Sequence, residues 1–133
     1  SINQINVEVD YDVRSAIGES VKLISKHLNV NAIVVMTESG NTDIIVSHYR
    51  PKNNIFALTP KQSICNKLSL VWGVTAIKTP KYKSTDEMIK ESQKILIDNN
   101  LLNIGSTFVL TAGVPVGITG STNMLKIHKI EKN

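Results

Sequence analysis

The sequence predicts an α/β fold in which a mostly parallel sheet is covered by helices on both faces. Two observations support this prediction. Short apolar runs typical of strands alternate along the chain with amphipathic stretches typical of helices. The last two of the five predicted strands are joined by a loop too short for a helical crossover, so the fifth strand should run antiparallel to the fourth.

The first half of the chain supplies two helices around a buried strand. Apolar residues spaced by three or four predict a helix between Asp10 and Leu28, and the asparagines that follow it supply an end signal. The apolar run at 32–36 predicts a strand buried on both faces. A short helix is expected over about 41–49, because Pro51 disfavours helical geometry in the residue before it.

The second half repeats the alternation. Thr59 and Pro60 predict a helix start, with the hydroxyl as N-cap and the proline at the first helical position. Ser84 and Glu87 form a capping box that begins another helix, which should end near Asn99. Doubly buried strands are predicted at 55–58, 74–77 and 107–112, and the alternation around 124–128 predicts an edge strand with one wet face.

Composition is typical of a single globular domain over residues 1–133. The chain is 41% hydrophobic and 20% charged, and no stretch approaches the ~20 apolar residues of a membrane span. The lone Cys65 cannot form an internal disulfide, which suits a reducing cytosol, so we expect a cytoplasmic protein. The net charge is +4, but the basic residues are scattered and aromatics are only 5%, so neither nucleic acid nor a membrane is an expected partner. Because the first residue is serine, we expect a chain that was processed or cut from something longer.

The segment after the first strand is the best candidate binding site. A strand that ends in a hydroxyl-rich turn at a helix N-terminus can hold an anion, because free N–H groups and the helix dipole point outward there. Glu38 opposes this use, since a carboxylate about 6 Å from a unit of phosphate charge costs about 3 kcal/mol at an effective dielectric near 20, unless it faces water. The alternative is an ordinary capping turn. The candidate residues are Thr37, Ser39, Gly40, Asn41 and Thr42.

A second glycine- and hydroxyl-rich loop spans Gly113–Thr122. Its glycines would let the backbone approach a ligand closely, although a plain connection between strands is an equal alternative. If the first and fourth strands are neighbours, both loops open at the same end of the sheet and form one crevice.

No catalytic or metal-binding constellation can be assembled from the remaining residues. The three histidines at 27, 48 and 128 are dispersed. Asp43 and Asp86 fall in first helical turns, where a carboxylate interacts favourably with the helix dipole without any catalytic role. Trp72 is interpreted as a packing residue.

Four blocks of sequence resemble the C-terminal domain of pyruvate kinase, and the resemblance extends from about Val13 to Ile130. The blocks are AIVVMTESGNT (32–42), SHYRPKNNIFALTP (47–60), LSLVWGV (68–74) and TAGVPVGITGSTNMLKIH (111–128). The resemblance implies a three-layer α/β/α sandwich with a five-stranded mixed sheet in the order 3-2-1-4-5. It also implies that this domain is not the catalytic one and carries no cofactor, because a separate barrel absent from this chain holds the Mg²⁺ and K⁺ sites.

The resemblance further implies a regulatory role. The turn Thr37–Thr42 would take the phosphate of an effector, with the loop residues Gly117, Thr119 and Gly120 opposite. The start of the fourth family helix, here 85–88, lacks the basic residue that holds the second phosphate of a sugar bisphosphate, so a monophosphate effector, or none, fits better. The family also implies packing against the barrel and assembly into tetramers.

The main hypothesis is therefore the regulatory and oligomerisation domain of a pyruvate kinase, inactive when isolated. A free-standing module that binds a small phosphorylated metabolite in the same crevice is the alternative. A third possibility is an assembly domain whose crevice stays empty, which the charge of Glu38 suggests.

Overall fold

The computed structural model describes residues 12–114, 116 and 122–132. The elements follow the predicted alternation of helices and strands. In chain order they are α2 (Val13–His27), β1 (Ala32–Met36), α3 (Asn41–His48), β2 (Ile55–Thr59), α4 (Gln62–Leu68), β3 (Val74–Lys78), α5 (Thr85–Asp98), β4 (Thr107–Ala112) and β5 (Met124–Lys129). Among the described residues, no helix combines the length and apolarity that a membrane crossing needs.

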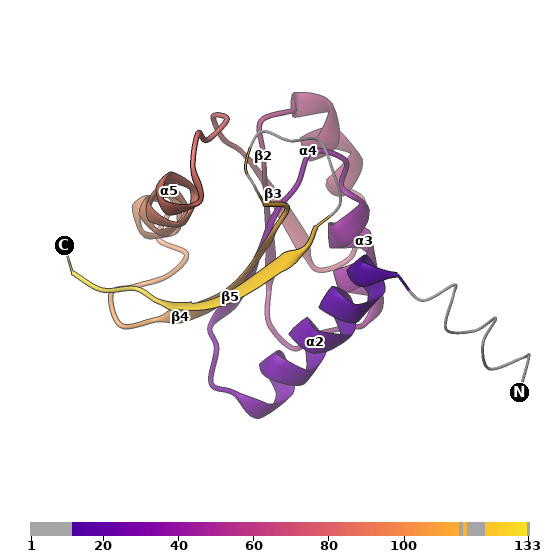
Figure 1. Cartoon of the computed structure of the whole chain (residues 1–133), viewed down its shortest axis with the longest axis horizontal. Helices are drawn as coiled ribbons and strands as arrows, with labels where there is room; N and C mark the ends of the chain where they lie inside the picture. The colour runs from indigo at the N-terminus through magenta and orange to yellow at the C-terminus, as the bar shows by residue number, and fades with distance from the viewer. Residues whose placement is uncertain (1–11, 115, 117–121, 133) are drawn as a thin grey trace, which may run out of the picture.

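The five strands form one sheet in the order β3-β2-β1-β4-β5. Strands β1 to β4 pair in parallel, and β5 runs antiparallel to β4. Helix α5 covers one face of the sheet, while α2, α3 and α4 lie on the other (Figure 1). The predicted three-layer sandwich, its strand order and the direction of the last strand are all confirmed.

Alternation along the central strands divides the core between the two faces. Val34 of β1 packs on the α5 side with Leu96. Its neighbours Ile33 and Val35 pack on the opposite side with Val21 of α2 and residues of α3. The central strands are therefore buried on both faces, as their unbroken apolar runs predict.

Two helices begin as their capping residues predict. The Asp12 carboxylate accepts a hydrogen bond from the Ser15 backbone N–H at 2.9 Å at the start of α2. At the start of α5, the Ser84 hydroxyl accepts from the Glu87 N–H at 3.1 Å. The Glu87 carboxylate accepts from the N–H of Lys83 at 2.8 Å, one residue before the partner that a capping box uses.

The predicted start of α4 is wrong by two residues. Thr59 does not cap the helix, because it continues β2 and pairs with Lys78 of β3. The helix instead begins at Gln62 after Lys61, and the Thr59 hydroxyl accepts a hydrogen bond from the Lys61 N–H.

The predictions for β3 and Trp72 also need correction. Strand β3 is an edge of the sheet and is only partly buried, not buried on both faces. Trp72 is 59% exposed, because α4 ends at Leu68 and the turn that follows carries the ring to the surface. There the Arg50 guanidinium lies 4.1 Å from the centre of the indole ring.

Candidate anion-binding pocket

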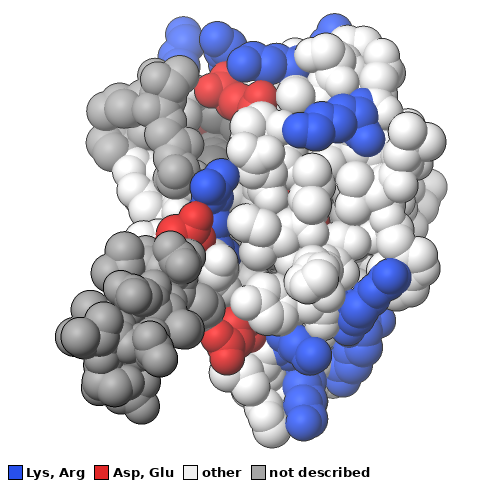
Figure 2. All heavy atoms as spheres, turned by 90° about the vertical axis from the view of Figure 1, so that its right-hand side faces the viewer, with Lys and Arg blue, Asp and Glu red and all other residues white. Residues whose placement is uncertain are grey.

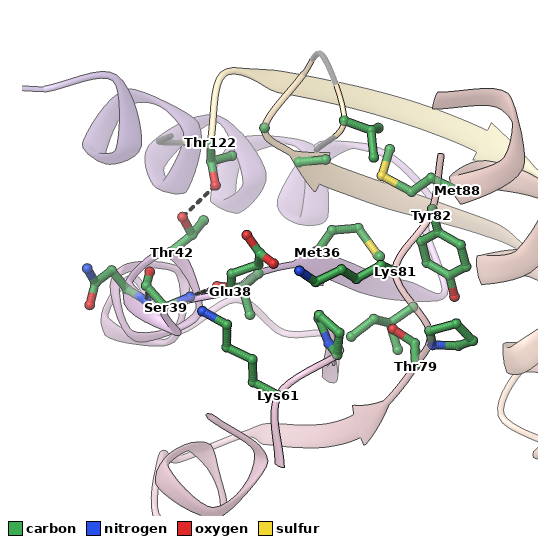
Figure 3. A pocket seen from close by; sticks show the side chains of 18 of the residues that line it. Met36, Glu38, Ser39, Thr42, Lys61, Thr79, Lys81, Tyr82, Met88 and Thr122 are labelled. Atoms are coloured by element: carbon green, nitrogen blue, oxygen red, sulfur yellow. Dashed lines mark hydrogen bonds between the residues drawn. The ribbon is translucent and has the colours of Figure 1, made fainter. Parts of the chain in front are cut away.

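A pocket of about 520 Å³ opens at the carboxyl ends of the four parallel strands (Figure 3). Its wall contains most of the turn 37–42 after β1, Pro60 and Lys61 after β2, residues 79–82 after β3, and Gly113 after β4. Ligands of open α/β sheets bind at this edge, where the strand order reverses. The predicted phosphate turn therefore lies in the wall of a real pocket.

Hydroxyl groups within the turn occupy its backbone donors. The Thr37 hydroxyl accepts from the N–H groups of Gly40, at 2.8 Å, and Ser39, at 3.3 Å. The Ser39 hydroxyl accepts from the Asn41 N–H at 3.2 Å. These three N–H groups are already hydrogen-bonded within the turn, whereas the sequence predicted that free N–H groups would point outward to hold an anion. A hydroxyl that accepts still has its own hydrogen to donate, so the hydroxyl groups are the donors that the turn offers to an anion.

Thr42 connects the turn to the far side of the pocket. Its hydroxyl oxygen lies 2.6 Å from the Thr122 hydroxyl, and both side chains are buried (Figure 3). One hydrogen of this pair is used between the two oxygens, which leaves the other free to donate. The pair fixes the end of the β4–β5 connection against the first turn of α3.

Gly40 shapes the turn through its backbone. It is the N-cap of α3 and has a φ of 83°, a left-handed conformation that favours glycine. A Cβ at this position would lie 3.3 Å from a methyl carbon of Leu68 on α4. The turn is therefore packed against α4 at a point where only glycine fits without adjustment.

Charged side chains surround the turn. The Lys61 ammonium points toward Ser39, and the Lys81 ammonium and Glu38 carboxylate point toward one another (Figure 3). Lys67 of α4 donates to the Ser39 carbonyl at 3.3 Å. Glu38 is exposed, so its charge is screened by solvent and faces a cation. This arrangement reduces the repulsion that Glu38 would exert on a bound anion.

The inner end of the pocket is largely apolar. Met36, Leu58 and Met88 line it together with Thr79 and Tyr82. The hydroxyl oxygens of Thr79 and Tyr82 are buried, and neither makes a hydrogen bond of ordinary geometry to the described residues. Burial raises the pKa of the Tyr82 phenol, which the neighbouring Thr79 hydroxyl lowers only in part, so this group stays protonated and remains a donor. The inner end of the pocket thus offers apolar surface with two neighbouring hydroxyl groups.

Asp43 departs from the role predicted for a carboxylate in a first helical turn. Its side chain is 0% exposed, and neither carboxylate oxygen makes a hydrogen bond of ordinary geometry to the described residues. Burial raises the pKa of this carboxyl to about 8, while its own backbone N–H and the Thr37 hydroxyl are near enough to lower it only in part. Asp43 is therefore mainly neutral at pH 7 and does not stabilise the helix dipole as a charge.

Four of the five predicted turn residues line the pocket, namely Thr37, Ser39, Asn41 and Thr42, and Gly40 shapes the turn. The three predicted loop residues, Gly117, Thr119 and Gly120, lie outside the described residues. Sequence reasoning missed the residues that β2, β3 and α2 contribute. These are Arg14, Lys61, Thr79, Lys81 and Tyr82. Most could have been found from the rule that placed the turn, because they follow the carboxyl ends of neighbouring parallel strands.

No group of histidine, cysteine, aspartate or glutamate side chains in the described part of the chain could hold a metal ion. Cys65 is half-buried on α4 and unpaired.

Residues 15–128 match the family model of the pyruvate kinase alpha/beta domain. The pyruvate kinase of Geobacillus stearothermophilus is 41% identical over 129 residues, which make up 97% of this chain and 22% of that protein. The enzyme of Staphylococcus aureus strain USA300 is 40% identical over 122 residues, which are 92% of this chain and 21% of that protein. The chain thus spans about a fifth of the length of the curated relatives it matches.

Solved structures of a similar domain come from Cryptosporidium parvum. One pyruvate kinase structure superimposes with a TM-score of 0.78 and 25% identity, covering 89% of this chain and 23% of that one. A structure of the Cryptosporidium enzyme in complex with ADP gives a TM-score of 0.77 and 27% identity, with 88% and 23% covered.

Proposed function

Because the chain belongs to the family of pyruvate kinase alpha/beta domains, we propose that it is the regulatory and assembly domain of such an enzyme. Its pocket would bind a small effector that carries one phosphate group. The observation that carries this proposal is the pocket itself, which joins hydroxyl donors, lysines and an apolar inner end at the carboxyl edge of the sheet.

The phosphate is proposed to lie against the turn 37–42. The hydroxyl groups of Thr37 and Ser39 would donate to its oxygens, and Lys61 would supply a charge-assisted hydrogen bond. The remainder of the effector would extend toward the apolar inner end. A bisphosphate is disfavoured, because the first turn of α5 carries Asp86 and Glu87 where a second phosphate would need a cation.

Catalysis is assigned to a barrel domain outside this chain. That barrel would transfer the phosphoryl group from phosphoenolpyruvate to ADP with Mg²⁺ and K⁺, in the cytoplasm. The isolated chain should then give no pyruvate in a coupled assay with phosphoenolpyruvate and ADP, and measurable turnover would contradict this assignment.

An uncharged face supports the assembly role. Figure 2 shows the side of the molecule that carries α2, α3 and α4, where a broad area without charged side chains lies between groups of Lys and Arg. Exposed apolar side chains on these elements include Val13, Leu23 and Ile44. Such a surface suits contact with another copy or with the barrel. The homo-oligomer can be tested by analytical ultracentrifugation of the chain.

Two other functions remain distinguishable by experiment. A free-standing metabolite-binding module would be encoded without an upstream barrel, so the reading frame of the gene decides between it and the main proposal. The similarity to pyruvate kinases favours the domain of a larger enzyme. An assembly domain with an empty crevice would not respond to any phosphorylated compound.

A thermal shift experiment tests the effector proposal. Sulfate, sugar monophosphates, a sugar bisphosphate and nucleotides would be added separately, and a ligand at 100 times its Kd should stabilise the chain by about 2.7 kcal/mol. Lys61→Met should weaken the response to monophosphates, whereas Lys52→Met, at an exposed lysine outside the pocket, should leave it unchanged. Absence of stabilisation by every compound would leave the empty assembly domain as the better description.

A further inference from the structure

Asp43 is a fully buried carboxyl without a hydrogen-bond partner among the described residues. An isolated carboxylate is strongly disfavoured in such surroundings, and a buried acid commonly takes up a proton instead. The burial of Asp43 and the lack of a charged partner among the described residues therefore favour the neutral carboxylic acid, in agreement with its raised pKa.

The position of Asp43 connects it to the pocket. It is the third residue of α3 and directly follows Asn41 and Thr42, whose side chains line the pocket wall. Thr37, which also lines the pocket, is the one other side chain that influences the pKa of Asp43. The Thr37 side chain therefore both interacts with this carboxyl and borders the pocket.

The charged and titratable groups on the surrounding elements are all at or near the surface. On α2 they are Arg14, Glu19, Lys22, Lys26 and His27. The others are Glu38 of the turn, Lys61 just before α4, Cys65 and Lys67 of α4, and His48 and Tyr49 at the far end of α3. The pKa of Asp43 is shifted by burial, by its own N–H and by Thr37, and by no charged side chain of the described residues. Ionisation of Asp43 would therefore place an uncompensated negative charge behind the turn.

We propose that Asp43 makes anion binding in this pocket depend on protonation. The neutral carboxylic acid permits an anion to occupy the turn, and ionisation of the same carboxyl weakens that binding. This inference rests on the proposed function, because it concerns the same pocket. For scale, two unit negative charges repel enough at an effective dielectric near 20 to weaken binding roughly 50-fold if they lie about 7 Å apart.

Sulfate is the appropriate probe, since it remains a dianion from pH 6.5 to pH 9.5 and adds no titration of its own. Isothermal titration calorimetry at constant ionic strength should show the affinity of the chain for sulfate falling at least tenfold between pH 7 and pH 9.5. Asp43→Asn should remove most of this fall. Asp98→Asn, at an exposed carboxylate at the end of α5 and outside the pocket, should behave as the unmodified chain does.

Proton uptake gives a second measurement that does not depend on a variant. Sulfate binding at about pH 9 should take up roughly three quarters of a proton, measured by repeating the titration in buffers of different ionisation enthalpy. A pH-independent affinity without proton uptake, or the same fall in Asp43→Asn, would overturn the role of Asp43 and leave the proposed anion site intact. If sulfate does not bind at any pH while the Asp43 carboxyl titrates near 8 by NMR, the proposed pocket function fails instead, and this inference fails with it.

Discussion

The replacement of Asp43 by asparagine gives a direct test of how this carboxyl is buried. The pKa of the acid is about 8 in the folded chain and near 3.8 when unfolded. At a pH between these two pKa values, the folded chain holds one more proton than the unfolded chain. The free energy of unfolding therefore falls as pH rises, by about 1.4 kcal/mol per pH unit. The loss should amount to about 4 kcal/mol between pH 5 and pH 8 and should level off above the folded pKa.

Asparagine has nearly the same shape but does not titrate, so the difference between the two chains isolates Asp43. Urea unfolding followed by circular dichroism at several pH values should show Asp43→Asn gaining stability over the unmodified chain as pH rises from 5 to 8. All other ionisable groups are shared and cancel in the difference. Asp86→Asn is the control, because that exposed carboxylate should change stability by a few tenths of a kcal/mol at every pH. A constant difference between Asp43→Asn and the unmodified chain from pH 5 to pH 9 would show that Asp43 is ionised in the folded state and would refute the reasoning.

Two further substitutions test the turn. Gly40→Ala should destabilise the chain more than Gly105→Ala. Both glycines have positive φ, so alanine costs about 1–2 kcal/mol of backbone strain at either position, but of the two only Gly40 would bring its new Cβ against a neighbour. Equal losses in urea unfolding would argue against the contact with Leu68. Thr42→Val should cost about 1–3 kcal/mol by leaving the buried Thr122 hydroxyl without a partner, and the double replacement with Thr122→Val should cost less than the sum of the single ones in a double-mutant cycle. Additive losses would indicate that the two hydroxyl groups do not interact.

The fold could be predicted because its signals are local. The apolar run of β1 has no polar interruption, and the capping residue Ser84 marks the start of α5 one residue before the helix begins. The connection between β4 and β5 fixes their antiparallel pairing by its length alone. Each of these features depends on residues that are neighbours in the sequence, so it can be read from the sequence alone.

The predictions of the fold that were wrong concern features set by residues that are neighbours in space. Thr59 and Pro60 resemble a helix start, but pairing with Lys78 keeps Thr59 in the strand. The short apolar run of β3 resembles that of an inner strand although it contains Thr75, and the strand order makes β3 an edge. Trp72 lies at the surface because its helix ends early, which no local pattern signals.

In the candidate site, too, the features set by neighbours in sequence could be predicted and those set by neighbours in space could not. The turn 37–42 was predicted from its own residues, whereas Lys61 and Lys81 reach it only because β2 and β3 end at the same edge of the sheet. Asp43 was interpreted as a carboxylate that interacts with the helix dipole, since sequence position places it in a first helical turn without showing which face of α3 is buried. Its burial depends on how α3 packs in the fold and could not be predicted from sequence alone.

The charge lining the pocket brings these residues into one argument about the ligand. Three cationic side chains and one carboxylate line its described part, Arg14, Lys61, Lys81 and Glu38, which gives a net charge of +2. This charge matches a phosphate monoester dianion and falls short of a bisphosphate. Glu38 is compatible with that match because Lys81 points toward it (Figure 3), and a protonated Asp43 adds no further negative charge behind the turn. Under the proposed function, the protonation state of Asp43 would therefore determine whether the pocket keeps a net charge suited to a monophosphate.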